Sequence, residues 1–548
     1  MLRGKRNSIR TNVGNLFHEY CANSSVHGVR YLSCRERTAC EKFWWLLVFL
    51  LSIGSCSLLI RKIYHKWDQT PVIVSFDEKS TRIWQIPFPA VTLCPQTKAG
   101  QSWLNFSREH IENMVGEDVI PDHNMTDYFI AMVQMCERTF YHVLHNSEML
   151  PNKTSSDSFA TLIDDMSIPM KETIHFCFFR GRIVDCEALF RKTITEDGIC
   201  FTFNGLSNEQ LLRPETVFLK EDFPLSEIRN ASDWTLEHGY SAQSDLSSYP
   251  YRTVASGYSS GLAMNLITNN RNYDYLCGGP VQGLKVLLHS PADYPQVSKK
   301  FIRVPLNQEV TIAVKPQMIV TAETLRNYAP ERRQCFFDHE RYLRFFQVYT
   351  QDNCELECLT NFTFRYCGCV KFSMPHSNRT AICESNKIDC MILAENELLE
   401  MDAVKHRKGE WNYRADCNCL PSCTSVQYDA EITQTDFDWM KWSVSYGMSL
   451  KGSEGVHISR LGIYYKEAQF MASKRSELYG LTDFLANCGG LLGLCMGVSL
   501  LSLVELVYFC SVRPFVLGRN TKEMSSKAEN DTPAISLLST AVGIKDGF

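Results

Sequence analysis

Two stretches of the chain hold apolar runs long enough to cross a lipid bilayer. The first, Phe43 to Ile60, is uncharged and is bounded on both sides by basic residues. The second, Phe484 to Val504, also contains no charged side chain. Because a helix needs about 20 apolar residues to cross a bilayer, the pattern predicts two transmembrane helices, over residues 43–63 and 481–511.

The second stretch carries small residues in a helical pattern. On a helix that turns 100° per residue, four of them fall within about 60° of one another: Ala486, Gly490, Gly493 and Gly497. Ser499 falls on nearly the opposite side of a straight helix. A break at Gly497-Val498-Ser499 would instead free backbone carbonyls, which then need water or protein around them. Such a break favours a pore.

A simpler interpretation of the same glycines is a packing motif. Gly489, Gly493 and Gly497 form two overlapping GxxxG repeats, which also occur in helix pairs that conduct nothing. Glu505 follows the apolar run, where a carboxylate is either an interface residue or part of an ion path. These residues alone leave both interpretations open and slightly favour packing.

Basic residues flank the spans on the sides of both chain ends. Residues 1–42 carry eight Lys or Arg against three Glu, and the first basic residues after the second span are Arg513, Arg519, Lys522 and Lys527. By the positive-inside rule both termini lie in the cytoplasm. We therefore divide the chain into a cytosolic N-terminal tail (1–42), a first span (43–63), an extracellular domain (64–480), a second span (481–511) and a cytosolic C-terminal tail (512–548). The last part is expected to be disordered.

The cysteines indicate the compartment of the region between the two spans. Of 23 cysteines, sixteen lie between Cys94 and Cys423, and an even number confined to one region indicates disulfides in an oxidising compartment. Six Asn-x-Ser/Thr glycosylation sequons agree with an extracellular location: Asn105, Asn124, Asn152, Asn230, Asn361 and Asn378. Alternating segments such as Val310 to Val314 predict short strands, so this domain should be β-rich with a few helices.

One helix of the outer domain should carry two cysteines on one face. Asp352 and Glu355 form a start like a capping box, and Cys354 and Cys358 follow four residues apart. Both can reach one strand, predicted at residues 417–423. An antiparallel arrangement nests three disulfides: Cys335–Cys423, Cys354–Cys419 and Cys358–Cys417.

The remaining composition excludes several functions. The formal net charge of −5 gives no footprint for nucleic acid. Cys367-Gly-Cys369 and Cys417-Asn-Cys419 have C-x-C spacing rather than the usual C-x2-C of zinc sites, so disulfides fit better and we assign no metal site. No spacing of His, Ser and acidic residues indicates a catalytic triad. We expect neither an enzyme nor a cofactor.

Taken together, these features resemble the degenerin/epithelial sodium channel family, which includes the acid-sensing channels, and most closely an insect pickpocket-type member. The resemblance runs from His27 to about Pro514. Its motifs are His27-Gly28, FPAVTLC (88–94), DGICFTFN (197–204), GLKVLLHSPADYP (283–295), YCGC (366–369), Met374-Pro375, CNCLPSC (417–423) and GVSLLSLVE (497–505).

The resemblance implies a trimeric cation channel at the plasma membrane, usually permeable to sodium and often blocked by amiloride. Two further subunits, the same or related, would complete it. Gly497-Val498-Ser499 matches the selectivity belt, and Ala486 matches the degenerin position, where a bulky side chain holds the pore open. His27-Gly28 matches a cytosolic gating pair. Glu505 matches an acidic residue on the inner side of the belt; an interface residue remains an equal alternative.

The resemblance also implies disulfide pairs. It repeats the three nested pairs and adds Cys94–Cys200, Cys177–Cys186, Cys367–Cys390 and Cys369–Cys383. Cys136 and Cys277 remain, and we expect them to pair because they complete an even set.

Two departures separate the chain from the acid-sensing members. Those members have a Trp shortly before the cysteine that matches Cys335, where this chain has residues 329–334, and they have an Asp where Asn487 stands. Proton gating is therefore not assumed. The stimulus, an extracellular ligand or a mechanical tether, stays open. The alternatives are an ATP-gated two-span channel, for which a basic phosphate cluster is lacking, and a non-conducting recognition protein, which leaves the Gly-Val-Ser break without a purpose.

Overall fold

A computed structural model of the chain describes the fold in two compact units. The described residues are 16–33, 37–69, 72–100, 103–107, 123–136, 159–217, 233–408, 417–447, 449 and 452–516. One unit joins the two ends of the sequence, residues 1–73 and 477–548, and the other comprises Val74–Ser476. Each unit is described by itself.

The unit of the chain ends is helical. Residues 16–23 are helical, and four labelled helices follow: α2 (Val29–Ser33), α3 (Ala39–Gln69), α15 (Leu481–Met496) and α16 (Leu500–Val507). A π-helical turn, η7 (Tyr508–Val512), continues α16, and the helix ends at Val516. Stacked and edge-on rings join α3 to α15, with Trp67 5.3 Å and Tyr64 6.3 Å from Phe484 between ring centroids.

Among the described residues, α3 is the single helix that is by itself long and apolar enough to cross a membrane. It is longer than the predicted span of 43–63, because residues on either side of the apolar run continue the helical hydrogen bonding. The helices α15 and α16 satisfy the same test only when taken together, and a bend of 74° separates them. The helix of this second stretch is therefore broken, as the interpretation of a pore required.

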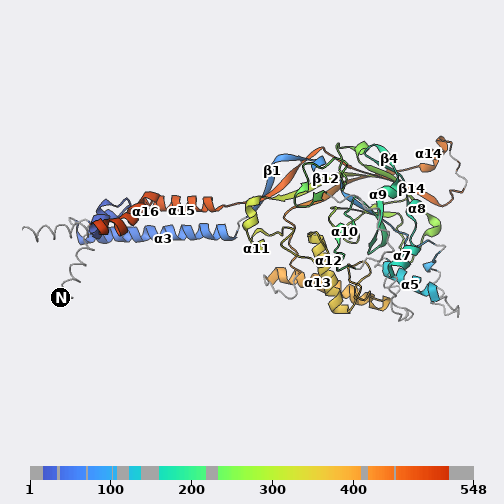
Figure 1. Ribbon diagram of the computed structural model, residues 1–548, viewed down its shortest axis with the longest axis horizontal. Coiled ribbons are helices and arrows are strands. Elements are labelled where there is room, and N and C mark those ends of the chain that lie inside the picture. Colours follow the sequence, from blue (N-terminus) through green and yellow to red (C-terminus); the bar gives the residue numbers. More distant parts are fainter. Residues whose placement is uncertain are drawn as a thin grey trace, which may run out of the picture. The chain divides into compact units, whose positions relative to one another are not determined.

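The outer unit, Val74–Ser476, is built on a large mixed sheet (Figure 1). Its strands follow the order β1-β15-β12-β14-β9-β3-β4, and β13 also pairs with β12. In chain order they are β1 (Val72–Arg82), β3 (Ile174–Phe179), β4 (Arg182–Val184), β9 (Leu262–Asn269), β12 (Gln308–Thr321), β13 (Ser425–Asp436), β14 (Val456–Tyr465) and β15 (Gln469–Glu477). β12 pairs antiparallel with β13 and parallel with both β14 and β15. The predicted strand Val310–Val314 is thus the start of β12.

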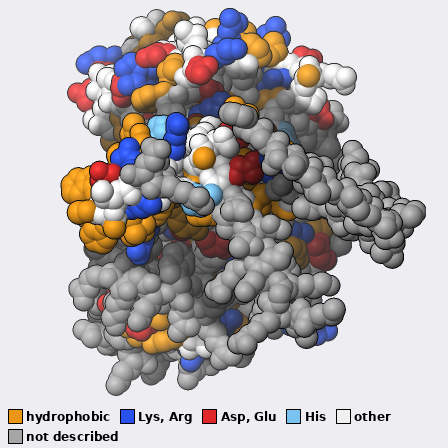
Figure 2. Space-filling view, turned by 90° about the vertical axis from the view of Figure 1, so that its left-hand side faces the viewer, with side chains coloured by type: hydrophobic (Ala, Val, Ile, Leu, Met, Phe, Trp, Pro, Cys, Tyr) orange, Lys and Arg blue, Asp and Glu red, His pale blue; other side chains and the backbone are white. Residues whose placement is uncertain are grey.

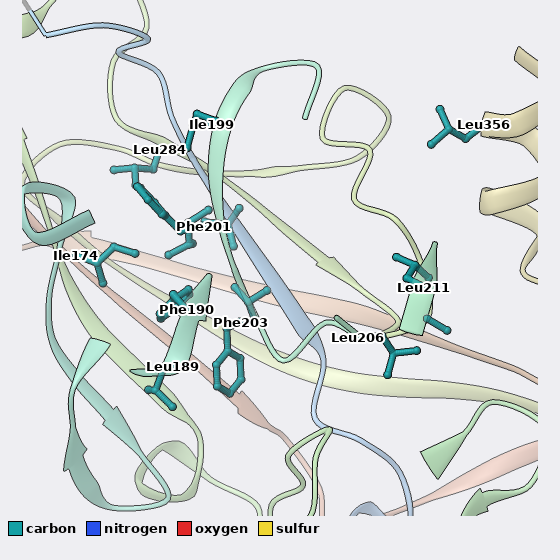
Figure 3. Close-up of a cluster of buried hydrophobic side chains, with 14 of the residues drawn as sticks. Ile174, Leu189, Phe190, Ile199, Phe201, Phe203, Leu206, Leu211, Leu284 and Leu356 are labelled. Atoms are coloured by element: carbon teal, nitrogen blue, oxygen red, sulfur yellow. The ribbon is translucent and has the colours of Figure 1, made fainter. Parts of the chain in front are cut away.

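A smaller sheet carries the most buried strand. It has the order β11-β10-β2-β6-β5, with β2 (Ala90–Pro95), β5 (Phe190–Thr195), β6 (Gly198–Phe203), β10 (Leu284–His289) and β11 (Ile302–Val304). Every residue of β6 is buried, and Phe201 and Phe203 lie in the core beside Phe190 (Figure 3). The Phe203 ring lies 5.2 Å from Phe179 and 5.7 Å from Phe190 between centroids. Such packing of aromatic rings fixes the position of the sheet.

Helices and short strands surround these sheets. The helices are α5 (His123–Met135), α7 (Phe159–Met166), α8 (Met170–Thr173), α9 (Cys186–Leu189), α10 (Asn208–Leu211), α11 (Pro330–Arg333), α12 (Gln351–Cys367), α13 (Ile388–Lys408) and α14 (Trp439–Ser445). A two-stranded ribbon joins β7 (Trp234–Thr235) to β8 (Gly239–Tyr240). Short 3₁₀ turns are η1 (Ile83–Gln85), η3 (Tyr258–Ser260), η4 (Asn270–Asn272), η5 (Glu323–Asn327) and η6 (Ser385–Lys387).

The helix with two cysteines begins two residues earlier than predicted. Thr350, which is extended, caps α12 by accepting a hydrogen bond from the backbone N–H of Asn353 at 3.1 Å. The predicted start at Asp352 is wrong because the Thr350 hydroxyl already serves as the N-cap acceptor. Residues 417–423 were expected to form a strand and do not; they are irregular apart from one bridge between Ser422 and Phe336. Pro421 lacks the N–H that a regular ladder would use.

All sixteen cysteines of the outer unit form disulfides in the pairs that the sequence suggested. The eight bonds are Cys94–Cys200, Cys136–Cys277, Cys177–Cys186, Cys335–Cys423, Cys354–Cys419, Cys358–Cys417, Cys367–Cys390 and Cys369–Cys383. Three of them have a cysteine in α12, and one of these three, Cys367–Cys390, joins the end of α12 to the start of α13. The helix α12 is therefore braced along its length.

The segment that departs from the acid-sensing members buries an arginine. Residues 330–333 form the short helix α11, and Arg333 is 1% exposed. Its guanidinium donates to the carbonyls of Cys335 and Tyr328 and pairs with Glu340. Burial lowers the pKa of Arg333. A buried, fully bonded cation thus holds this turn.

Candidate functional site

The break between α15 and α16 covers Gly497, Val498 and Ser499, and its first and last residues differ in backbone conformation. Gly497 ends α15 in the left-handed region, with φ +67° and ψ 20°. Ser499 is extended and caps α16, accepting from the backbone N–H of Ser502 at 3.4 Å. Glycine adopts the left-handed conformation without the penalty that a Cβ brings, and serine is a preferred N-cap. The tripeptide therefore encodes its own break.

The carbonyl oxygens around the break have different partners. Cys495 O accepts a hydrogen bond from Ser52 Oγ of α3 at 2.8 Å, and Met496 O accepts one from the backbone N–H of His27, also at 2.8 Å. Within the described part of the chain, the carbonyl oxygens of Gly497 and Val498 receive no hydrogen bond. Unsatisfied carbonyls at membrane depth require water, an ion or another chain.

The His-Gly pair lies against this break. His27 and Gly28 form a turn, and Gly28 has φ +88°. A Cβ placed on Gly497 would lie 2.8 Å from the His27 ring, too close for a side chain. The structure thus brings together two of the predicted site elements, which are separated by 470 positions in the sequence.

Glu505 is engaged by the same N-terminal segment. Its Oε2 accepts hydrogen bonds from the backbone N–H of Ser25 at 3.2 Å and from Ser25 Oγ at 3.0 Å. Ser25 Oγ also lies 2.7 Å from the hydroxyl of Ser502. Arg513 and Glu19 form a further ion pair between the segment and the end of the helix, at 2.5 Å. Sequence reasoning considered a pore carboxylate and an interface carboxylate, and it did not identify Ser25 or Ser502.

Ala486 lies on the exposed surface of α15 within this single chain. The adjacent Asn487 donates from its side-chain amide to the carbonyl of Asp483 at 2.8 Å. Large apolar side chains on α3, including Phe43, Trp44, Leu51 and Leu58, are also exposed. Figure 2 shows hydrophobic side chains gathered in a patch on the face that is turned toward the viewer. Such surfaces suit lipid or a further subunit.

A buried ion-pair cluster and a separate carboxyl group with a raised pKa lie in the outer unit. Asp197, before β6, pairs with Lys98 at 3.5 Å and Lys285 at 2.9 Å. Burial opposes ionisation of Asp197, but the two ammonium groups outweigh it and lower its pKa to about 2. Asp293 shows the opposite balance: burial and the nearby carboxylate of Asp352 raise its pKa to about 7.

The predicted glycosylation sequons are only partly described. Asn378 is exposed, while Asn361 on α12 and Asn105 are half-buried. The side chain of Asn124 and the whole of Asn152 and Asn230 lie outside the described residues, as does Cys34 of the N-terminal tail. Among the residues that the structure describes, no group of three or more His, Cys, Asp or Glu is arranged to hold a metal ion.

A long apolar helix, a broken apolar helix pair and a disulfide-braced, β-rich domain define a membrane protein with a large outer domain. Comparison with known proteins identifies its kind. The protein family described as amiloride-sensitive sodium channel matches residues 20–509. The chain belongs to this family of sodium channels, which confirms the resemblance seen in the motifs.

Individual relatives extend the match over most of the chain. It is 27% identical to pickpocket protein 28 of Drosophila melanogaster over 514 residues, covering 92% of this chain and 79% of that protein. It is 23% identical to sodium channel protein Nach of the same organism, covering 92% and 88%. It is 22% identical to acid-sensing ion channel 1 of Gallus gallus, covering 94% and 87%. Members of this family are multi-subunit channels of the plasma membrane and not enzymes.

Proposed function

We propose that the chain is one subunit of a trimeric, sodium-permeable channel whose pore passes through the break at Gly497-Val498-Ser499. The helix α3 is the first span, and α15 with α16 forms the second. Both termini are cytoplasmic, and residues 64–480 are extracellular. The observation that supports this most is the pair of carbonyl oxygens, of Gly497 and Val498, that receive no hydrogen bond from the described residues at the break in the helix.

Three copies of the break would form a ring of carbonyl dipoles. Such rings replace part of the hydration shell of a cation and so select among cations. Val498 contributes its backbone to the ring. The Ser499 hydroxyl caps α16 and thereby holds the shape of the belt.

The N-terminal segment would hold the belt from the cytoplasmic side. The backbone N–H of His27 donates a hydrogen bond to the Met496 carbonyl, so that oxygen is not available to the ion. Glu505, through Ser25, ties the same segment to α16. A movement of His27-Gly28 would therefore change both the direction of the belt carbonyls and the position of the Glu505 carboxylate. This gives the pair a mechanical route to gating.

Ala486 would form the gate. Three copies of a small side chain allow the helices to approach closely around one axis, and a bulky side chain prevents this. The stimulus acts on the outer domain, as an extracellular ligand or a tether, and the braced helix α12, which carries Cys354 and Cys358, passes the movement on. Block by amiloride is expected from the family description. A recognition protein without a pore is the second candidate, and nothing in it would require a broken span.

The test replaces Ala486 by Val and records current from cells under voltage clamp. We expect a sodium current at rest that amiloride blocks, because the added methyl groups hold the three helices apart. Ala486→Gly is the matched control and should leave the resting current at the wild-type level. Surface biotinylation establishes equal delivery of all three proteins. An Ala486→Val protein that reaches the surface and conducts no more than the wild type would remove Ala486 from the gate.

A further inference from the structure

One thiol occupies a special position on the first span. Of the 31 residues of α3, Cys56 is the single buried side chain, at 2% exposed. The cysteines of the outer unit are all paired, whereas the described cysteines of the helical unit are free thiols: Cys21, Cys40, Cys56, Cys488, Cys495 and Cys510. The side chain that α3 buries is therefore a reactive group rather than an inert one.

Contacts between α3 and α15 place a second thiol opposite Cys56. The two helices run antiparallel, since Trp67 stacks on Phe484 near one end while Ser52 binds the Cys495 carbonyl near the other. Cys56 lies one helical turn after Ser52, on the same face. The Cys56 thiol has a hydrogen-bond interaction with the Cys495 thiol and an electrostatic interaction with the Cys488 thiol.

The environment of the two thiols differs. Cys56 is enclosed between the helices, whereas Cys495 is half-exposed and lies two residues before the break at Gly497. Polar groups gather at this level, among them the Ser52 hydroxyl and the unpartnered carbonyls of the break. If water reaches the break, as the proposed function requires, it hydrates Cys495 first. A thiol ionises, and thus reacts, far more readily when it is hydrated.

We propose that Cys56 and Cys495 are an oxidisable pair, which hydrogen peroxide, a small uncharged oxidant, closes into a disulfide between α3 and α15. The Cys495 thiolate attacks one peroxide oxygen, the O–O bond breaks, and a sulfenic acid and hydroxide form. The Cys56 thiol then attacks the sulfenic sulfur and expels water. Overall two thiols and one peroxide give one disulfide and two waters. This inference rests on the proposed function only for the hydration of Cys495.

The disulfide would fix the belt to the first span. It joins α3 to α15 two residues before Gly497, and the Ser52 bond already holds the Cys495 carbonyl at the same level. If the angle between α15 and α16 must change for the pore to open, the disulfide would prevent that change. Reduction by a membrane-permeant dithiol restores both thiols.

The direct test is a peptide map of the full-length protein after treatment with hydrogen peroxide. Trypsin releases Cys56 in the peptide Phe43–Arg61 and Cys495 in Ser476–Arg519. We expect these two peptides joined in a single species that dithiothreitol separates. The species should be lost in Cys56→Ser and in Cys495→Ser, and it should persist in Cys488→Ser, the matched control. Persistence in Cys495→Ser, loss in Cys488→Ser, or a bond between two copies of the chain would overturn the assignment.

A second readout separates this inference from the proposed function. In the Ala486→Val background we expect peroxide to lower the sodium current several-fold and dithiothreitol to restore it. With Cys495→Ser added to this background, the sodium current should persist and should not change when peroxide is applied. If Ala486→Val carries no current, the proposed function fails while the peptide map still decides the thiol pair. A current that peroxide leaves unchanged despite complete crosslinking would overturn the locking role.

Discussion

Replacing Asp197 by Asn tests how the outer unit tolerates buried charge. The side chain of Asp197 is 14% exposed, and its two partners are more buried still, Lys98 at 4% and Lys285 at 9%. Asn has nearly the same shape but no charge. The substitution therefore leaves two buried ammonium groups without their shared carboxylate.

The size of the effect follows from this burial. Removing one member of a buried ion pair costs about 3 to 5 kcal/mol, because the remaining charge stays desolvated. The outer unit has roughly 400 residues between Val74 and Ser476. With an unfolding entropy of about 2 cal/mol/K per residue, this cost lowers Tm by about 4 to 6 °C. The pKa of Asp197 is lowered to about 2, so the carboxylate is ionised from pH 5 to 8. The drop in Tm caused by Asp197→Asn should therefore be constant over that pH range.

The assay is thermal unfolding of the full-length protein in detergent, followed by tryptophan fluorescence. Glu431→Gln is the matched control, since Glu431 also pairs with two lysines, Lys315 and Lys466, each at 2.6 Å. That carboxylate is half exposed, and water replaces its partners. We expect a clear drop in Tm for Asp197→Asn and little change for Glu431→Gln. Equal shifts in the two variants would refute the argument that burial decides the energy.

Further predictions concern a carboxyl group and a helix cap of the outer unit. The raised pKa of Asp293 means that the folded protein favours the protonated form, so its contribution to stability is fully present below about pH 4 and is lost as the pH rises to about 7. Asp293→Asn should therefore raise Tm at pH 8 more than at pH 5, and a uniform shift would contradict this. Thr350→Ala should lower the free energy of unfolding by about 1 kcal/mol, because it removes the N-cap of α12. Thr350→Ser, measured in the same melting experiment, should keep most of the stability that the cap contributes.

The sequence predicted the parts of the molecule that depend on local pattern. Uncharged apolar runs located both membrane stretches. The small residues of the second stretch left a break at Gly497-Val498-Ser499 and a packing motif both open, and the family resemblance then favoured the break. The parity of the outer cysteines indicated disulfides, and family motifs supplied most of the pairs. Each of these features can be identified from residues close together in the chain.

Features that depend on distant segments could not be predicted in this way. The contact of His27 with Gly497 and the bonds from Ser25 to Glu505 join residues nearly 500 positions apart. Asp197 pairs with Lys98 and Lys285, which come from two other segments of the chain. The residues around each lysine give no indication of this pairing. Even the start of α12 was misplaced, because Thr350 and Asp352 are both acceptable caps in sequence and only the folded backbone selects one.

The central claim is that sodium passes the belt formed by Gly497-Val498-Ser499. Its most direct test is the sodium-to-potassium permeability ratio, measured from reversal potentials in the Ala486→Val background. Gly497→Ala adds a Cβ to a left-handed residue, at a cost of about 1 to 2 kcal/mol, and forces it against the His27 ring. Gly54→Ala in α3, where a Cβ meets nothing within 4 Å, is the control.

We predict that Gly497→Ala lowers the sodium preference or abolishes the current, while Gly54→Ala keeps both at the parent value. An unchanged permeability ratio and current in Gly497→Ala would show that ions are selected elsewhere, and the proposed pore would be wrong.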